Sequence, residues 1–312
     1  MTGGHKFGDT QPSGDVGLDR GRANAAAIVA MVVSQAVFTV NDALMKLAAQ
    51  DMPGGQAIFI RGLFTIVLAG LLAWRLGGFR GWPTRRQWPL IGLRNVGEVG
   101  ATFLYLTALF HMPIAETTAI LQFLPLAITA GAALFLGEAV GWRRWLATAV
   151  GLVGVLIVIR PGTAGFNGWS LVALASVVAI VLRDLTTRRI DRTVPTVLLT
   201  LISSVTVTVA ASGFALFETW QSPKPHVLGL IGGAALFLLG GYYFIIEAMR
   251  RGEVAVVSPF RYSAILWAIV AGIVLFGEWP DAQALAGTSL VMLAGLYTFF
   301  RERQLKLERE RA

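Results

Sequence analysis

Charged side chains inside long apolar stretches are the residues of this sequence that could do chemistry. Glu98 lies near the middle of one such stretch, and Arg94 stands four positions before it. On a helix, residues at i and i+4 share a face, so the two side chains can form an ion pair. An ionisable group near the centre of a bilayer costs about 2.5–3.5 kcal/mol on insertion scales, so each one needs a reason. Two explanations stand: a structural ion pair, or a charged cavity wall that binds a zwitterion or carries a proton.

Arg261 is the clearest candidate for a ligand contact. It lies in another apolar stretch, beside Pro259 and Tyr262. Proline donates no backbone hydrogen bond, so carbonyl groups near it are freed, and a guanidinium beside such a break suits a carboxylate. Gln122 and Pro125 lie at a similar depth in an earlier stretch. We expect Arg261 and Gln122 to face a cavity, because contact with lipid would be the costliest alternative.

Other polar and aromatic residues are weaker candidates. Snorkelling or pairing at the membrane interface explains Asp42 and Arg61 as well as ligand binding does. Arg183, Asp184 and Glu247 lie toward the ends of their stretches, where they would form an inner gate or, more simply, local salt bridges. Several aromatic side chains would suit a cavity for a flat ligand, although ordinary packing should account for at least half of them: Tyr105, Tyr242, Tyr243, Tyr262 and Trp267.

The sequence lacks the groups that intramembrane enzymes and primary pumps need. It has no cysteine, and its three histidines, His5, His111 and His226, lie in the tail or at predicted helix ends, so we expect no metal site. No Ser/Lys-type dyad stands at midplane depth, and no GxxxxGK[ST] phosphate-binding loop is present. We therefore expect a chain that is not an enzyme, needs no cofactor and binds a small molecule.

The elements that hold these residues are predicted to be membrane-spanning helices. Hydrophobic residues make up 55% of the chain and charged residues 14%, whereas a typical soluble domain carries about 25% charge. Apolar runs of about 20 residues recur, each long enough to cross the hydrocarbon core as a helix, and they lack the alternation of a membrane β-barrel. The predicted all-α fold has ten transmembrane helices, at 25–46, 55–75, 88–110, 113–136, 143–160, 168–187, 194–217, 227–249, 253–276 and 283–300.

The basic residues predict the orientation of these helices. The formal charge is +8, but the charges gather in short clusters between apolar runs, which indicates topology signals rather than a nucleic-acid surface. With the N-terminus in the cytoplasm, the outside receives only Lys46, Arg160 and Lys224. We therefore expect a bacterial-type inner membrane protein with both termini in the cytoplasm. Residues 1–24 are predicted to be a disordered cytoplasmic tail without a cleaved leader, and residues 301–312 a basic cytoplasmic tail.

The chain contains an internal repeat. Leu136-Gly137-Glu138 superposes on Phe276-Gly277-Glu278 with a shift of 140 positions (278 − 138), and the surrounding sequence then aligns without a gap. This shift carries the first five predicted helices onto the last five. Because five is odd, the second copy must enter the membrane in the opposite orientation, as in transporters whose halves surround a midplane site. The two predicted repeats are residues 25–162 and 163–300.

The two copies, which end in Phe-Leu-Gly-Glu and Leu-Phe-Gly-Glu before a last apolar helix, resemble the EamA repeats of the drug/metabolite transporter superfamily. The resemblance covers residues from about 25 to 300. It implies a secondary transporter that moves a small molecule across the bilayer by alternating access around a central cavity, with a monomer as the simplest form. Members of this superfamily include YddG-like exporters of aromatic amino acids, so export of amino acids or related metabolites is the first expectation. Import of a nutrient such as riboflavin or a nucleoside-type metabolite is the alternative.

Overall fold

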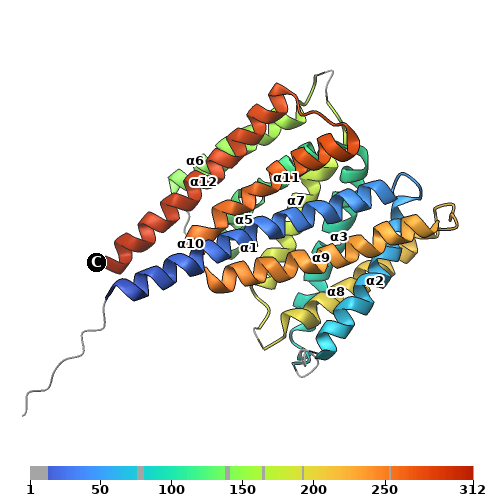
Figure 1. Ribbon diagram of the computed structural model, residues 1–312, viewed down its shortest axis with the longest axis horizontal. Coiled ribbons are helices and arrows are strands. Elements are labelled where there is room, and N and C mark those ends of the chain that lie inside the picture. Colours follow the sequence, from blue (N-terminus) through green and yellow to red (C-terminus); the bar gives the residue numbers. More distant parts are fainter. Residues whose placement is uncertain are drawn as a thin grey trace, which may run out of the picture.

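Membrane-length helices make up the fold. The computed structural model describes residues 13–75, 81–137, 141–163, 166–191, 193–252 and 254–311, and every regular element in these ranges is a helix (Figure 1). Nine helical segments there are long and apolar enough to cross a membrane. The remaining predicted span is α3 (Trp88–His111), which is more polar because it carries Arg94, Asn95 and Glu98. The predicted all-α fold is confirmed.

The helices follow the predicted spans closely. The first half consists of α1 (Ser13–Ala48), α2 (Gly54–Arg75), α3, α4 (Ile114–Leu121), α5 (Leu124–Leu136) and α6 (Trp142–Ile159). The second half consists of α7 (Trp169–Thr187), α8 (Thr196–Ala215), α9 (Pro225–Arg251), α10 (Val254–Val257), the 3-10 turn η2 (Ser258–Tyr262), α11 (Ser263–Ala271), the π-helical turn η3 (Gly272–Phe276) and α12 (Ala282–Arg311).

The N-terminal boundary differs from the prediction. We expected a disordered tail through residue 24, but α1 already begins at Ser13, and residues 1–12 lie outside the described part of the chain. Once a membrane span has nucleated a helix, each further residue adds one hydrogen bond for one residue fixed. No proline stands between Pro12 and Pro53, so nothing stops the helix from continuing past the bilayer.

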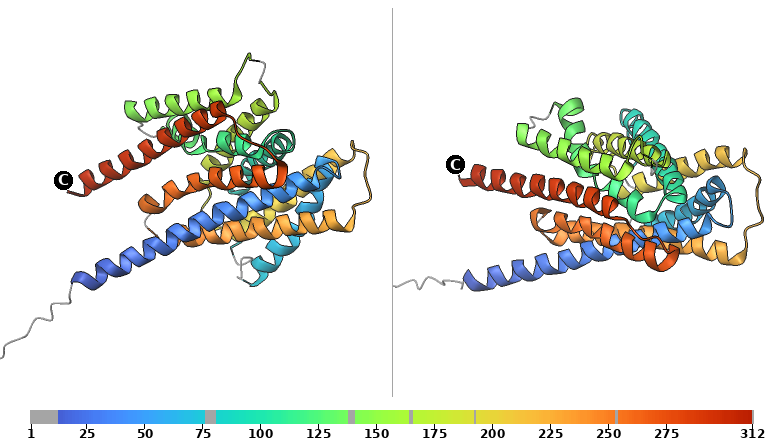
Figure 2. Two further views of the ribbon diagram at one scale, coloured as in Figure 1. Left: turned by 45° about the horizontal axis from the view of Figure 1, so that its top comes forward. Right: turned by 90° about the horizontal axis from the view of Figure 1, so that it is seen from above.

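The packing of the helices follows the internal repeat. The shift of 140 positions exchanges α1 with α7 and α3 with α9, so the two most extensive interfaces, α1 with α9 and α3 with α7, are copies of one another. The next two, α6 with α12 and α2 with α8, map onto themselves, as pairs on a twofold axis must. Figure 1 and Figure 2 both show α6 and α12 side by side at one edge of the bundle. This is the pseudo-twofold arrangement that an inverted repeat predicts.

Glycine allows α6 and α12, one helix from each half, to approach closely. A Cβ atom at Gly154 of α6 would lie 2.8 Å from the carbonyl oxygen of Gly287 in α12, and one at Gly287 would lie 2.6 Å from the carbonyl oxygen of Gly154. Any larger side chain would force the two backbones apart. Small residues bring helices together in this way in membranes, where packing rather than hydrophobic burial drives association.

The fourth span of each repeat is broken at the same level. In the first repeat α4 ends at Leu121 and α5 begins at Leu124, with Pro125 in its first turn. In the second repeat the break is η2, which holds Pro259 near its start. A break frees backbone groups from the helix ladder, and such groups are tolerated at membrane depth only inside protein or beside a wet cavity. Both breaks lie on the wall of the cavity described next.

Candidate functional site

A cavity of about 770 Å³ lies between the two repeats. Its wall takes residues from α1, α2, α3, α7, α9 and α12 and from both broken spans. It extends from Asp42 and Tyr105 in the interior to Arg144 and Arg188, which lie at one end of the bundle. Small-molecule sites typically measure about 300–1,000 Å³, so the space suits a metabolite.

Most of the residues singled out from the sequence line this cavity. They are Asp42, Arg61, Glu98, Tyr105, Gln122, Arg183, Asp184, Arg261 and Tyr262.

Four predicted residues do not line the cavity: Arg94, Tyr243, Glu247 and Trp267. Tyr243 is 62% exposed and does not line the cavity, whereas its neighbour Tyr242 does. Trp267 donates from its indole nitrogen to the Val32 carbonyl of α1, 3.2 Å away. Neither Tyr243 nor Trp267 is among the residues that line this cavity. Glu247 pairs with Arg251 one turn along α9, which is the local salt bridge that was the simpler alternative to a gate.

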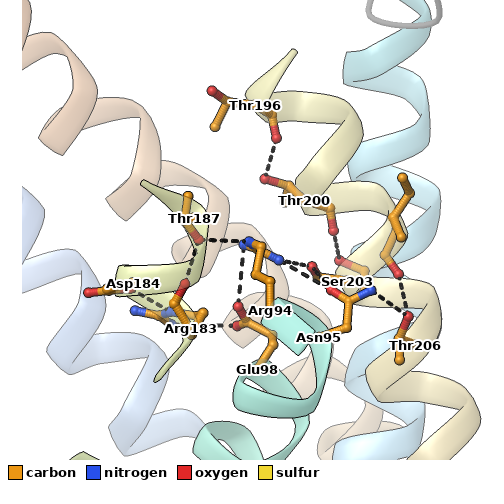
Figure 3. A network of polar contacts seen from close by, with 12 residues as sticks. Arg94, Asn95, Glu98, Arg183, Asp184, Thr187, Thr196, Thr200, Ser203 and Thr206 are labelled. Carbon is orange, nitrogen blue, oxygen red and sulfur yellow. Dashed lines mark hydrogen bonds and ion pairs between the residues drawn. The ribbon is translucent and has the colours of Figure 1, made fainter. Parts of the chain in front are cut away.

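Arg94 and Glu98 form the predicted ion pair, and the pair belongs to a larger network (Figure 3). Oε2 of Glu98 lies 3.4 Å from a guanidinium nitrogen of Arg94, and Oε1 lies 3.6 Å from one of Arg183. Nε of Arg183 also lies 2.8 Å from Asp184, and Nε of Arg94 donates to the hydroxyl of Thr187 at 3.1 Å. Glu98, Arg183 and Asp184 reach the cavity, whereas Arg94 stands behind Glu98 and holds it. The structural ion pair and the charged cavity wall are thus the same feature.

The two helix breaks meet at the cavity. Nε2 of Gln122, at the end of α4, donates to the backbone carbonyl of Arg261 in η2 at 3.3 Å. The Arg261 guanidinium forms no ion pair or hydrogen bond with the described residues, and it faces the cavity. Beside it, the Tyr262 ring is buried and packs so closely on α12 that a Cβ atom at Gly295 would collide with its hydroxyl. The guanidinium is therefore placed to receive an anionic group.

A second polar cluster lies on α1. The Asp42 carboxylate accepts a hydrogen bond from the Tyr105 hydroxyl at 2.5 Å and one from the side-chain amide of Asn41 at 2.8 Å. Gln35, Thr39 and Asn41 also line the cavity and were missed in the sequence. A signal for Gln35 and Thr39 was present, since Gln35, Thr39, Asp42 and Lys46 follow a spacing of four, three and four, which is one face of a helix.

The end of the bundle opposite Arg144 and Arg188 is closed by ion pairs. Nζ of Lys46 contacts Oε1 of Glu278 and the Met112 carbonyl, each at 2.5 Å. Oε2 of Glu278 accepts from the backbone N–H of Ile114, the first residue of α4, at 2.9 Å. One carboxylate thus joins α1, α4 and the segment after η3. The repeat partner of Glu278, Glu138, lies outside the described residues.

Two surface clusters reinforce this closed end. Arg160 donates to the Asp281 carboxylate and holds the pKa of that group below its usual value. The Asp51 carboxylate contacts His226 at 3.2 Å and Lys224 at 3.0 Å, and these two partners lower its pKa. Each cluster joins the first repeat to the second across the closed end.

Known proteins similar to this chain are bacterial transporters. It is 23% identical to the S-adenosylmethionine uptake transporter of Rickettsia prowazekii over 88% of this chain and 92% of that protein; the match to its counterpart in Rickettsia felis spans 65% of that relative. It is 24% identical to the pseudopaline exporter of Pseudomonas aeruginosa, over 86% of this chain and 94% of that one. It is 29% identical to the riboflavin transporter of Rhizobium johnstonii, over 67% and 68% of the two chains.

The fold and the family agree with these likenesses. One solved crystal structure superposes with a TM-score of 0.63 at 18% identity, over 90% of this chain and 99% of that one, which supports the fold alone. The model of the EamA-like transporter family matches twice, at residues 25–160 and 167–300, so the two matches correspond to the two packed repeats. A central cavity between inverted repeats, closed at one end, is the architecture expected of a small-molecule transporter. This chain belongs to the EamA-like transporter family.

Proposed function

We propose that this chain is a secondary transporter that exports amino acids or related small metabolites by alternating access. The observation that carries the proposal is a charged cavity between inverted repeats that reaches one end of the bundle and is closed at the other by Lys46 and Glu278. In alternating access one repeat rocks against the other around such a site. Breaking the closed end while sealing the end near Arg144 would produce the opposite state.

The basic residues support the proposed orientation. Arg144 and Arg188 lie at the end that the cavity reaches, and the positive-inside rule assigns that end to the cytoplasm. The cavity then faces the cytoplasm, with both chain termini on the same side. This is the state in which an exporter would load its substrate.

Import of a nutrient such as riboflavin or a nucleoside-type metabolite is the second candidate. It is favoured by the relatives named as an S-adenosylmethionine uptake transporter and a riboflavin transporter. An importer would release its substrate from the same cytoplasm-facing state, so the two candidates differ in substrate and in the direction of net flux rather than in architecture.

Counterflow in proteoliposomes tests the proposal. Liposomes containing the purified protein are preloaded with an unlabelled amino-acid mixture and diluted into trace amounts of each labelled amino acid, and the assay is repeated with riboflavin and nucleosides. We expect transient accumulation of at least one amino acid, absent from protein-free liposomes. Counterflow of riboflavin or a nucleoside alone would support the alternative, and no counterflow of any solute would overturn the transport proposal. Efflux from preloaded cells that express the protein then gives the direction.

A further inference from the structure

We propose that Asn41, Asp42 and Arg61 form a head-group site for an α-amino carboxylate, a ligand that carries an ammonium and a carboxylate on one carbon atom. This inference rests on the proposed transport function and specifies the chemistry that the cavity recognises. It assigns the inner end of the cavity to the head group and leaves the wider part, toward Arg261, for the side chain of the ligand.

Asn41 carries an unsatisfied acceptor. Its side chain is only 3% exposed and lines the cavity. Its amide nitrogen donates to Asp42 at 2.8 Å, but its Oδ1 atom is buried without a hydrogen-bond partner, and no other described side chain has such an atom. Buried polar atoms are normally paired, because an unmade hydrogen bond is costly in a low-dielectric site. A ligand that donates an N–H here would satisfy it.

Asp42 lies beside this acceptor and has capacity left. Its two hydrogen bonds come from neutral donors, Tyr105 and Asn41, so no contact neutralises its charge. A carboxylate has about four lone-pair sites, and an ammonium has three donors and no acceptor. The free sites of Asp42 and Oδ1 of Asn41 together therefore match an ammonium group.

The other acids of the cavity are already paired. Glu98 lies between Arg94 and Arg183, and Asp184 contacts Arg183. Among the cavity-lining residues that the structure describes, Asp42 is thus the carboxylate without an ion pair. A cationic group of a ligand would find its counter-charge there rather than at Glu98.

Arg61 supplies the other half of the head-group site. It lines the same cavity and interacts electrostatically with Asp42. It makes no ion pair with the described acids, so its nitrogens stay more than 4.0 Å from the Asp42 oxygens. Opposite charges held apart in a low-dielectric interior lose much of the attraction that contact would give. A zwitterion placed between them restores both contacts: its ammonium binds Asp42 and Asn41, and its carboxylate accepts two parallel hydrogen bonds from the guanidinium.

Ligand analogues test the site on the full-length protein in detergent. The twenty standard amino acids are first compared by the rise in melting temperature that each produces. The best of them is then compared with its decarboxylated amine and its deaminated acid, which each lack one half of the head group. We expect both analogues to bind at least tenfold more weakly. An amine or acid that binds as well as the parent would overturn the proposal.

Variants test the residues themselves. Asp42→Asn should weaken binding of the parent amino acid at least tenfold but leave the weak binding of the deaminated acid unchanged, because that analogue has no ammonium. Asp191→Asn, an exposed acid outside the cavity, is the matched control. If Asp42→Asn does not fold, Asn41→Leu replaces it, because this change removes the unsatisfied acceptor. Unchanged affinity for the parent amino acid in the variant that folds would refute the assignment.

Two outcomes separate this inference from the proposed function. Counterflow of riboflavin, a nucleoside or a simple amine, without binding of any amino acid, would overturn the head-group site while leaving the transporter proposal intact. Absence of counterflow with every solute would remove the transporter proposal itself.

Discussion

Glu278→Gln should open the closed end of the bundle. The wild-type carboxylate binds Nζ of Lys46 at 2.5 Å and accepts from the N–H of Ile114 at 2.9 Å. The variant keeps an oxygen for Ile114 but loses the charge that faces Lys46. Because Lys46 is only 9% exposed, water replaces this contact poorly while the end stays closed. The change therefore destabilises the closed arrangement selectively.

The expected size follows from the contact that is lost. A hydrogen bond to a charged group contributes about 1.5–3 kcal/mol. Removing one partner of a fully buried ion pair costs about 3–5 kcal/mol, but the Met112 carbonyl still accepts from Lys46, so the lower range applies. At about 1.4 kcal/mol per factor of ten, the ratio of open to closed molecules should rise roughly 10- to 150-fold.

Thiol labelling measures this ratio directly. The chain has no cysteine, so Thr118→Cys on the cavity wall introduces the sole thiol. A membrane-impermeant thiol reagent added outside intact cells reaches this position only when the outer end opens, given the proposed orientation. The labelling rate should increase about 10- to 150-fold when Glu278→Gln is added.

The controls decide whether the reasoning holds. Lys224→Ala breaks an exposed contact with Asp51 and should change the rate less than about fivefold, because exposed pairs contribute about 0–1 kcal/mol. An unchanged rate in Glu278→Gln, or an equal rise in Lys224→Ala, would refute the role of the Lys46–Glu278 contact. Thr129→Cys, nearer the other end of the cavity, should resist the external reagent in otherwise wild-type protein; rapid labelling would reverse the proposed orientation.

Three further predictions concern the site and the packing. Arg261→Ala should reduce counterflow more than about tenfold, because a guanidinium hydrogen bond to a polar or anionic group on the ligand's side chain is worth about 1.5–3 kcal/mol. Gly154→Leu should lower the thermal unfolding temperature in detergent, since its side chain would displace the Gly287 carbonyl, and overpacking costs about 1–3 kcal/mol. Asp281→Asn should lower the unfolding temperature at pH 6, and this loss should shrink as the pH falls below 3.8: Arg160 depresses the pKa of Asp281 below its ordinary 3.8, so the stabilisation is fully present above that value and is lost as the pH falls through the lower folded pKa.

The first two of these variants have matched controls. Arg250→Ala removes an exposed arginine outside the cavity and should leave counterflow unchanged. Gly229→Ala should fold as stably as the parent, because a Cβ atom there meets nothing within 4 Å. Full counterflow in Arg261→Ala would contradict the first prediction, and equal unfolding temperatures for Gly154→Leu and Gly229→Ala the second. A loss in Asp281→Asn that does not shrink as the pH falls below 3.8 would contradict the third.

Local features of the sequence predicted the spans and the repeat well. The length of each apolar run sets where a helix crosses the bilayer, and the Gly-Glu turns near Gly137 and Gly277 align the two copies. Even the pairing of Arg94 with Glu98 followed from a spacing of four along one helix. The extension of α1 back to Ser13 was not predicted, because helix propagation beyond the membrane leaves no hydropathy signal.

Contacts between distant helices were predicted less well. Lys46 counted in the sequence only as a charge on the outer side, yet it closes the bundle through a residue 232 positions away. Tyr242 and Tyr243 were equivalent as aromatic candidates until packing against α1 turned one of them inward. The spacing of Gln35, Thr39, Asp42 and Lys46 showed that these residues share one face of a helix. It did not show which other helices this face contacts.

The sequence by itself determined that this chain has ten membrane-length helices in two related halves, since hydrophobic length and repetition are properties of the chain alone. Only the tertiary structure decided which charges face one another. That choice depends on how each helix is rotated about its own axis, and the rotation is set by side-chain packing between elements far apart in the chain, such as Gly154 against Gly287. The unpaired Asp42 and Arg61, and the paired Lys46 and Glu278, are consequences of that packing.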